Sequence, residues 1–139
     1  MSFLIVKPRK VPLKIEILEA LLRRLPFNHP KIPTIQTALT NRKAGYKGEL
    51  ESDYHLSLLP EKDYFILHDI RLPHNDTFFQ IDSLIICPGF ILILDVKNFY
   101  GTIHLHPKSD QMVREYEGKE QGFSNPLVQA KRHLYLFHN

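Results

Sequence analysis

Four polar residues interrupt two apolar stretches of this chain, and their side chains are of the types that could hold a metal ion and act on a phosphate: Gln80, Asp82, Asp95 and Lys97. The stretches read FFQIDSLIIC and FILILDVKNFY, and the dipeptide Pro88-Gly89 joins them. Runs rich in Ile, Phe and Val on both sides of a Pro-Gly pair are typical of an antiparallel hairpin with a tight turn. We therefore predict two neighbouring strands that carry all four side chains.

The expected register of this hairpin brings the polar side chains together. With the Pro-Gly pair at the centre of the turn, Asp82 lies opposite Asp95. Gln80 likewise lies opposite Lys97. Side chains of a strand alternate between its two faces, so all four are expected to point to one side of the sheet.

The two aspartates of this hairpin need a positive partner. Carboxylates that face each other across neighbouring strands repel, and burial strengthens the repulsion. Either Lys97 or a divalent cation could compensate. Carboxylate oxygens and water suit Mg²⁺ or Mn²⁺, with a substrate phosphate completing the shell of ligands. The alternative is a buried Asp-Lys ion pair with a purely structural role.

The spacing of Asp, twelve residues, and Asp-Val-Lys resembles the PD-(D/E)xK, or restriction-endonuclease-like, nucleases. More narrowly, the chain resembles the nuclease-related domain (NERD) family from about Gly45 to Leu136. Four pieces carry this resemblance, in order: GYKGELE at 45–51, QID at 80–82, DVKNFYGTI at 95–103 and NPLVQ at 125–129. A lone D-x-K would have little value, but four ordered pieces are more specific.

The resemblance implies a role for each matching residue. Asp82 and Asp95 would be metal ligands, Lys97 the catalytic lysine, and Glu49 an acid on a helix that reaches the same ion directly or through water. The family usually has Glu where this chain has Asp95, and Asp is shorter by one methylene group.

Gln80 and Gln129 are the residues expected to bind substrate. Glu49, Gln80 and Gln129 each also have an alternative role. Glu49 near the start of a helix also suits the helix dipole. Gln80 could hold the head of Lys97 in place. The resemblance suggests that Gln129 approaches the site or the substrate, whereas a polar helix surface needs no such role.

Composition excludes few classes of protein. The chain has 139 residues, 43% of them hydrophobic and 24% charged, which is ordinary for one globular domain. The single cysteine, Cys87, excludes an internal disulfide and suits a small buried apolar position. No apolar run is long enough for a signal peptide core or a membrane span, so we expect a soluble cytoplasmic protein.

Charge is distributed unevenly along the chain. Residues 1–47 contain ten Lys and Arg against two Glu, a balance of +8, whereas residues 48–139 contain eight against thirteen acids, a balance of −5. A basic segment attracts phosphate backbones by counterion release and long-range steering. Nucleic acid, DNA in particular, is the expected partner; a solvated basic helix surface is the alternative.

The amino-terminal part is expected to be a helical extension, residues 1–44, followed by the nuclease-related domain, residues 45–139. After an irregular lead over 1–12, apolar spacing predicts a helix over Leu13 to Leu25 that Pro26 ends. A short helix over 34–42 and a first core helix over 45–59 follow. The exposed side of the first helix could also serve as the seam of a homo-oligomer.

The rest of the chain predicts an α/β (α+β) fold with a restriction-endonuclease-like core: a mixed central sheet with an antiparallel hairpin, flanked by helices. Strands are expected over 64–72, in the hairpin, over 102–106 and over 112–116. Because both hairpin strands are apolar on both faces, we expect them in the sheet interior. Asn125 and Pro126 predict the start of a final helix. The nuclease core normally adds one more strand after this helix, so either the fold lacks that strand or the chain is truncated.

We therefore predict a metal-dependent nuclease that hydrolyses phosphodiester bonds in DNA. Two alternatives remain open: a catalytically inactive nucleic-acid-binding or regulatory module on a nuclease fold, and a protein-interaction domain. Fold alone cannot choose among them.

Overall fold

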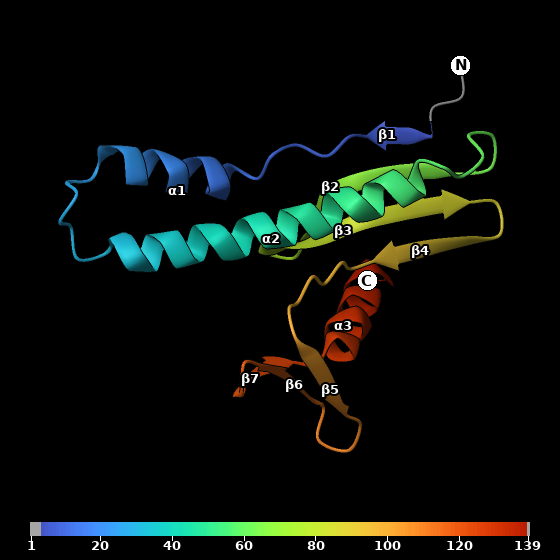
Figure 1. The fold of residues 1–139 in the computed structure, drawn as a ribbon. Helices are drawn as coiled ribbons and strands as arrows, with labels where there is room; N and C mark the ends of the chain where they lie inside the picture. Colours follow the sequence, from blue (N-terminus) through green and yellow to red (C-terminus); the bar gives the residue numbers. More distant parts are fainter. Residues whose placement is uncertain (1–3, 139) are drawn as a thin grey trace. The chain divides into compact units, whose positions relative to one another are not determined.

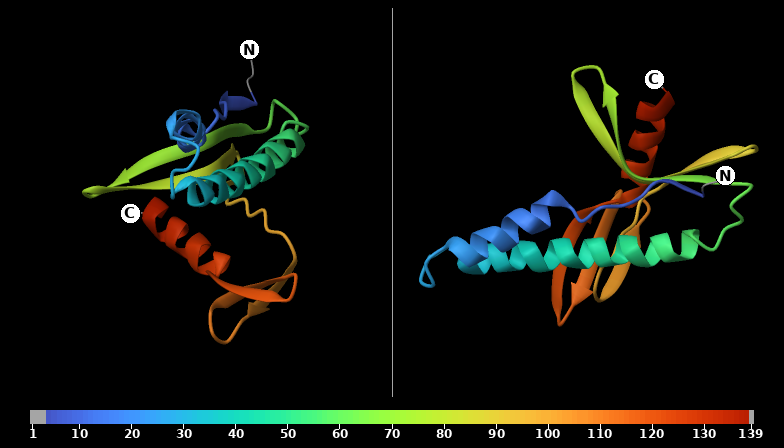
Figure 2. Two further views of the ribbon diagram at one scale, coloured as in Figure 1. Left: turned by 60° about the vertical axis from the view of Figure 1, so that its left-hand side comes forward. Right: turned by 90° about the horizontal axis from the view of Figure 1, so that it is seen from above.

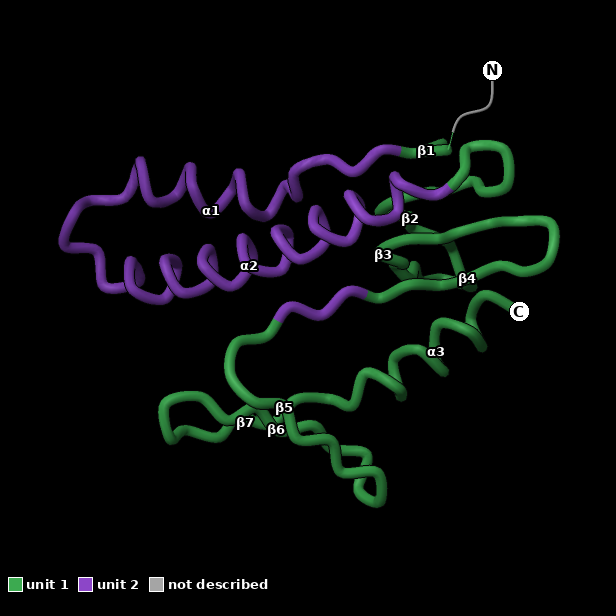
Figure 3. The backbone as a smooth tube through the Cα atoms, turned by 45° about the vertical axis from the view of Figure 1, so that its right-hand side comes forward, with its two compact units in different colours: residues 1–7, 60–95, 99–139 green, residues 8–59, 96–98 purple. Residues whose placement is uncertain are grey.

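The computed structural model describes residues 4–138 and divides the chain into two compact units (Figure 3). Unit 1 comprises the described residues of 1–7, 60–95 and 99–139, and unit 2 comprises residues 8–59 and 96–98. The described residues form three helices, one mixed sheet and one antiparallel sheet. The mixed α/β class expected from the sequence is thus confirmed.

Unit 1 contains a four-stranded sheet in the order β1-β2-β3-β4 (Figure 1). Its strands are β1 (Ile5–Lys7), β2 (Phe65–His74), β3 (Thr77–Cys87) and β4 (Phe90–Leu94). β1 pairs parallel with β2, and the other pairs are antiparallel. The prediction of an irregular lead was wrong at β1, because pairing with a strand some sixty positions away leaves no local signal in three residues.

The predicted hairpin is confirmed in register but not in length. Cys87 pairs with Phe90, and the ladder continues to the pair Ser83 and Leu94. We expected the second strand to include Lys97, opposite Gln80, but β4 ends at Leu94. The segment that follows is bound elsewhere, since the amide of Asn98 donates a 2.7 Å hydrogen bond to the carbonyl of Ala44.

The core of unit 1 lies between this sheet and α3 (Pro126–His138). Phe79, Ile81 and Leu84 are buried, and Leu136 and Phe137 of α3 pack against them. The expectation that both hairpin strands are interior was correct for β3 and wrong for β4. β4 is the edge strand, so Phe90, Ile91 and Leu92 are exposed. Helix α3 begins as predicted, with Asn125 Oδ1 accepting a 2.9 Å hydrogen bond from the Leu127 N–H.

A second, antiparallel sheet completes unit 1, with strands β5 (Thr102–His106), β6 (Gln111–Tyr116) and β7 (Lys119–Ser124). The first two strands were predicted, and β7 was not, because KEQGFS has little strand character. Gly101 precedes β5 with φ of +83°, and a Cβ there would collide with the Glu115 carbonyl oxygen. The chain therefore requires glycine at this bend.

Unit 2 consists mainly of two helices that run side by side, α1 (Leu13–Arg24) and α2 (Ile32–Leu56) (Figure 2). Ile15 and Leu18 of α1 are buried. Lys43 contacts Glu19 at 2.7 Å, and this hydrogen bond, with the charge of Lys43, lowers the pKa of Glu19. None of the helices among residues 4–138 is long and apolar enough to cross a membrane.

α2 replaces the two separate helices that we predicted over 34–42 and 45–59. It is continuous for 25 residues and passes through position 44, where we divided the chain. Near this junction the residues least favourable to a helix are Gly45 and Gly48. Each glycine costs a helix only about 1 kcal/mol. Tertiary packing offsets that cost at Gly48.

At Gly48, α2 lies very close to another segment of unit 2. A Cβ placed on Gly48 would lie 2.6 Å from Cβ of Asn98, a distance that real side chains do not reach. Asn98 can therefore bind the Ala44 carbonyl only because position 48 has no side chain. Gly48 of the motif GYKGELE thus leaves the space in which Asn98 of the motif DVKNFYGTI binds α2.

We expect Gly48→Ala to destabilise the protein relative to Gly45→Ala. Alanine favours a helix over glycine by about 1 kcal/mol at either position. Position 45 has no atom within 4 Å of the added methyl group, whereas position 48 meets Asn98. Overpacking costs about 1–3 kcal/mol, so urea unfolding should rank Gly45→Ala above wild type and Gly48→Ala below it. Equal stability of the two variants would contradict the close approach.

Candidate active site

Asp82 and Asp95 lie at the end of the β3–β4 ladder in unit 1. The last observed pair is Ser83 with Leu94; Asp82 directly precedes Ser83 along the chain, and Asp95 directly follows Leu94. Asp82 is half-buried on β3, and Asp95 directly follows β4. The observed strand register therefore agrees with the predicted one as far as Ser83 and Leu94, the pair next to the two aspartates.

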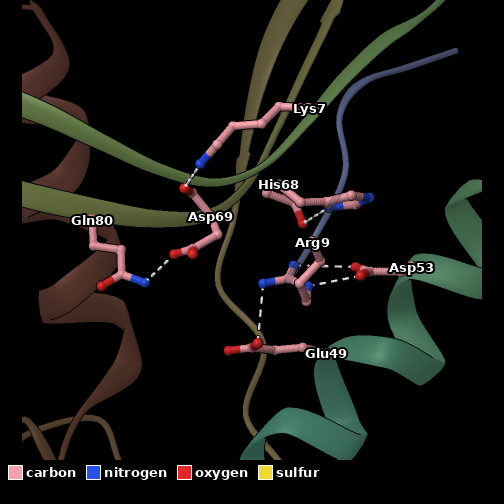
Figure 4. A network of polar contacts seen from close by, with 8 residues as sticks. Lys7, Arg9, Glu49, Asp53, His68, Asp69 and Gln80 are labelled. Carbon is pink, nitrogen blue, oxygen red and sulfur yellow. Dashed lines mark hydrogen bonds and ion pairs between the residues drawn. The ribbon is translucent and has the colours of Figure 1, made fainter. Parts of the chain in front are cut away.

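A buried polar pair fixes β3 next to Asp82. His68 Nδ1 lies 2.8 Å from the Ser83 hydroxyl, and both side chains are buried between β2 and β3 (Figure 4). A buried hydrogen bond of this kind resists slippage of the strands, because breaking it would leave polar groups without water. The backbone that carries Asp82 is thus held on its β2 side.

Asp95 is placed against α3 by His133. Its Oδ2 lies 3.1 Å from Nδ1 of His133, and the two side chains are only 12% and 9% exposed. The ring nitrogen is close but not aligned for a hydrogen bond. The other oxygen of Asp95, Oδ1, is buried and has no hydrogen-bond partner among the described residues.

This arrangement fits a cation only in part. An unpartnered buried carboxylate oxygen is costly unless a positive group balances it, and a hard cation is such a group. Among residues 4–138, however, no three His, Cys, Asp or Glu side chains are grouped closely enough to hold a metal. Mg²⁺ commonly takes one or two carboxylates and completes its shell with water and substrate phosphate. Asp82 and Asp95 suit that kind of site.

His133 was not predicted as a site residue. The sequence contained one signal, since His133 follows Gln129 by one helical turn and thus shares a side of α3 with it. Gln129 is half-buried on that helix. Only the packing of α3 against β3 and β4 brings His133 to Asp95.

Gln80 does not have the partner that we expected. β4 ends before Lys97, so the ladder provides no pairing between them in the described chain. Instead Gln80 donates a hydrogen bond to Asp69 Oδ1, and Lys7 donates to the carbonyl oxygen of the same Asp69 (Figure 4). Asp69 has φ of +51°, which turns its backbone out of the regular pattern of β2.

Glu49 lies in unit 2, bound to Arg9 (Figure 4). Arg9 Nη1 donates to Glu49 Oε2 at 3.0 Å, while Nε and Nη2 bind Asp53 at 2.7 and 3.1 Å. The Arg9 side chain is 4% exposed. This fork joins the chain before α1 to one side of α2, and it gives Glu49 a structural partner. Sequence analysis assigned no role to Arg9.

Lys97 belongs to the same unit and is exposed. Its neighbour Asn98 is held on α2 at Ala44 and Gly48, and Glu49 directly follows Gly48. The structure therefore places Asp82 and Asp95 in unit 1, and Glu49 and Lys97 in unit 2.

Comparisons with known proteins agree with the sequence motifs. A family model described as nuclease-related domain (NERD) matches residues 44–139. An uncharacterized protein of Bacillus anthracis is 29% identical over 92 residues, which cover 65% of this chain and 43% of the relative. The chain thus spans less than half the length of that relative. No solved structure matches the chain.

Loss of the Arg9 side chain should destabilise the protein. Arg9→Ala leaves Glu49 and Asp53 facing each other without their cation, and breaking a buried ion pair costs about 3–5 kcal/mol. Because the carboxylates are 22% and 14% exposed, we expect the lower end of that range in urea unfolding. Arg42→Ala, an exposed position on α2, is the matched control and should change stability by less than about 0.5 kcal/mol. A similarly small loss of stability for Arg9→Ala would show that water can replace the Arg9 side chain between Glu49 and Asp53.

Proposed function

Because the chain belongs to the nuclease-related domain family, we propose that it is a metal-dependent nuclease that hydrolyses phosphodiester bonds in DNA. Membership of the family indicates a nuclease-related function, and the metal and the substrate are part of the proposal. The observation that supports it is the buried Asp95 carboxylate, one oxygen of which has no hydrogen-bond partner in the described chain. Such a group suits a cation and is otherwise unfavourable.

Asp82 and Asp95 would hold Mg²⁺ or Mn²⁺, and Glu49 would reach the same ion directly or through water. When bound, the cation would lower the pKa of a water molecule and polarise the scissile phosphate. The β3–β4 ladder fixes the backbone of both aspartates up to the adjacent pair, which limits how far their carboxylates can separate. Preorganised ligands of this kind lose little entropy on binding.

Lys97 would orient the attacking water or stabilise the negative charge that develops on the phosphate. It follows Asp95 by two residues, so the two α-carbons are within about 7 Å in any chain conformation. Asn98, bound to Ala44, restricts the backbone beside the lysine. The exposed ammonium group is free to meet a phosphate from solution.

Gln80 and Gln129 are proposed contacts to substrate. Gln80 is exposed on β3, and its amide is held by Asp69, which would fix its direction. Gln129 lies one turn before His133 on α3. Amide groups contact phosphate and sugar oxygens without reading base sequence.

DNA as the partner is supported by the basic surface of unit 2. Besides Lys97, eight Lys and Arg residues of this unit are exposed: Lys10, Lys14, Arg23, Arg24, Lys31, Arg42, Lys43 and Lys47. Lys43 and Lys47 also contact acids, at 2.7 and 3.9 Å. A surface of this kind would follow the phosphate backbone, with weak sequence preference and strong dependence on salt.

We also propose a cytoplasmic location, because a single cysteine is consistent with a reducing compartment.

A second function is favoured by one observation. Glu49 is bound by Arg9, as an acid with a structural role would be. Together with Asp in place of the family's usual Glu at position 95, this favours a module that binds nucleic acid without cleaving it. Such a module would bind DNA equally well in EDTA.

A homo-oligomer is a further proposal. The exposed Leu13, Ile17 and Leu21 of α1 would provide its interface.

The nuclease proposal predicts that Asp82→Ala and Lys97→Ala each reduce cleavage of DNA at least 100-fold in Mg²⁺ or Mn²⁺. The measurement is the initial rate on labelled single-stranded and double-stranded DNA, with EDTA as the blank. Asp76→Ala, in the exposed turn between β2 and β3, is the control and should cleave like wild type. Cleavage that persists in both site variants would refute the assignment, and no cleavage by wild type with metal-independent binding would favour the second function.

The DNA proposal predicts that Arg23→Ala with Arg24→Ala weakens binding and reduces its salt dependence. Each phosphate contact contributes about 0.9 to the slope of log K against log salt, so the slope should fall by about 1 to 2. Fluorescence anisotropy at several salt concentrations measures it. The matched control is Lys131→Ala with Arg132→Ala, an exposed pair on α3. Equal slopes for the two double variants would mean that unit 2 has no particular role in binding.

A further inference from the structure

Phe27 lies in the turn that joins α1 to α2 in unit 2 (Figure 2), and it is the most exposed large apolar side chain among the described residues. Its exposed fraction is 96%, whereas the next, Leu13, is 68% exposed. Almost none of the ring is covered by the described chain, so Phe27 adds little to the packing of the two helices. An aromatic ring that lies almost wholly in water is available to a ligand.

The turn that carries Phe27 is fixed by hydrogen bonds. The N–H of His29 donates to the carbonyl of Pro26 at 2.9 Å, so Phe27 is the second residue of a β-turn. The N–H of Ile32 then donates to the His29 carbonyl at 3.1 Å, and the N–H of Lys31 donates to His29 Nδ1 at 3.2 Å. A turn held in this way loses little conformational entropy when it binds a partner.

Three cations flank Phe27 along the chain. Arg23 and Arg24 lie in the last turn of α1, and Lys31 directly precedes α2; all three are exposed. Each is four residues from Phe27 or fewer, so its α-carbon lies within about 15 Å of that of Phe27 in any conformation. Residues 20–48 contain no Asp or Glu. The ring is therefore surrounded along the chain by positive charge.

One ring among several cations fits a single strand of DNA better than a protein or a membrane. Protein interfaces and membrane-bound helices use an apolar patch of many side chains, whereas the residues that follow Phe27 are the polar Asn28 and His29. A nucleic-acid base needs only one ring to stack on, and the phosphates beside it attract cations. The base must be unpaired, because neighbouring pairs cover both faces of a base inside a duplex.

We propose that the turn between α1 and α2 binds single-stranded DNA, with Phe27 stacked on an unpaired base and Arg23, Arg24 and Lys31 at the neighbouring phosphates. This inference rests on DNA as the partner in the proposed function, and it adds which form of DNA is bound. The contact does not read base sequence, since every base has a face on which a ring can stack.

The first test uses the full chain with Phe27→Trp, which gives it a single tryptophan because the sequence has none. Stacking on a base quenches indole fluorescence, so a single-stranded oligonucleotide should quench the emission. The duplex that this strand forms with its complement should not. A strand of the same length with abasic sugars keeps the phosphates and should not quench either. No quenching by a single strand that binds, or equal quenching by the abasic strand, would overturn the proposal.

The second test measures affinity for the same strands by fluorescence anisotropy. Phe27→Ala should bind the single strand about 5- to 100-fold more weakly, which corresponds to the loss of one base stack. Its slope of log K against log salt should equal that of wild type, because no phosphate contact is removed. Phe27→Leu should lose nearly as much affinity as Phe27→Ala, since leucine is apolar but has no ring.

Phe90→Ala is the matched control, because Phe90 of β4 is a 54% exposed phenylalanine of the other unit. It should bind the single strand like wild type. Substitution of a side chain as exposed as Phe27 should change stability by less than about 0.5 kcal/mol, and circular dichroism checks that each variant is folded. Equal affinities of wild type and Phe27→Ala, or equal losses for Phe27→Ala and Phe90→Ala, would overturn the proposal.

The outcomes also separate this inference from the proposed function. Salt-dependent DNA binding that Phe27→Ala does not weaken would retain DNA as the partner and reject the turn. Quenching by the single strand without cleavage would retain the turn and reject the nuclease. No binding of any DNA would overturn both. A blue shift of the Phe27→Trp emission with phosphatidylserine and phosphatidylcholine vesicles, without a response to the single strand, would indicate a membrane surface and overturn the proposal.

Discussion

The close approach of Asn98 to Gly48 is the constraint on which the arrangement of the candidate residues depends. The Asn98 amide binds the carbonyl of Ala44, and this contact requires that α2 has no side chain at position 48. β4 ends at Leu94, although Val96, Phe99 and Tyr100 are good strand formers. Asp95 directly follows β4, and Lys97 directly precedes the Asn98 side chain that binds α2.

Buried polar groups are the second theme of this structure. Arg9 with Glu49 and Asp53, and His68 with Ser83, are pairs in which each named contact is a hydrogen bond of normal length. These groups stabilise one arrangement of their elements, since the alternatives would leave charges unpaired. Asp95 and His133 form a third buried pair, with Oδ2 and Nδ1 3.1 Å apart, which joins the end of β4 to α3.

The position of Asp95 also gives a physical reason for its departure from the family's usual Glu. Asp95 lies within 3.1 Å of a side chain that reaches it from α3. A carboxylate longer by one methylene would extend into that histidine, and overpacking a buried site costs about 1–3 kcal/mol. The shorter acid therefore fits beside His133.

The sequence by itself determined those features that depend on neighbouring residues. Pro88-Gly89 between apolar runs fixed the turn and register of the hairpin, Leu13 to Leu25 predicted α1, and Asn125-Pro126 predicted the start of α3. The motifs also determined the family, because they require particular side chains in a particular order. Only the tertiary structure decided where β4 ends, that α2 is continuous, and that Arg9 binds Glu49 while His133 meets Asp95. These contacts join residues about 40 positions apart, and no periodicity along a chain records which distant surfaces will exclude water together.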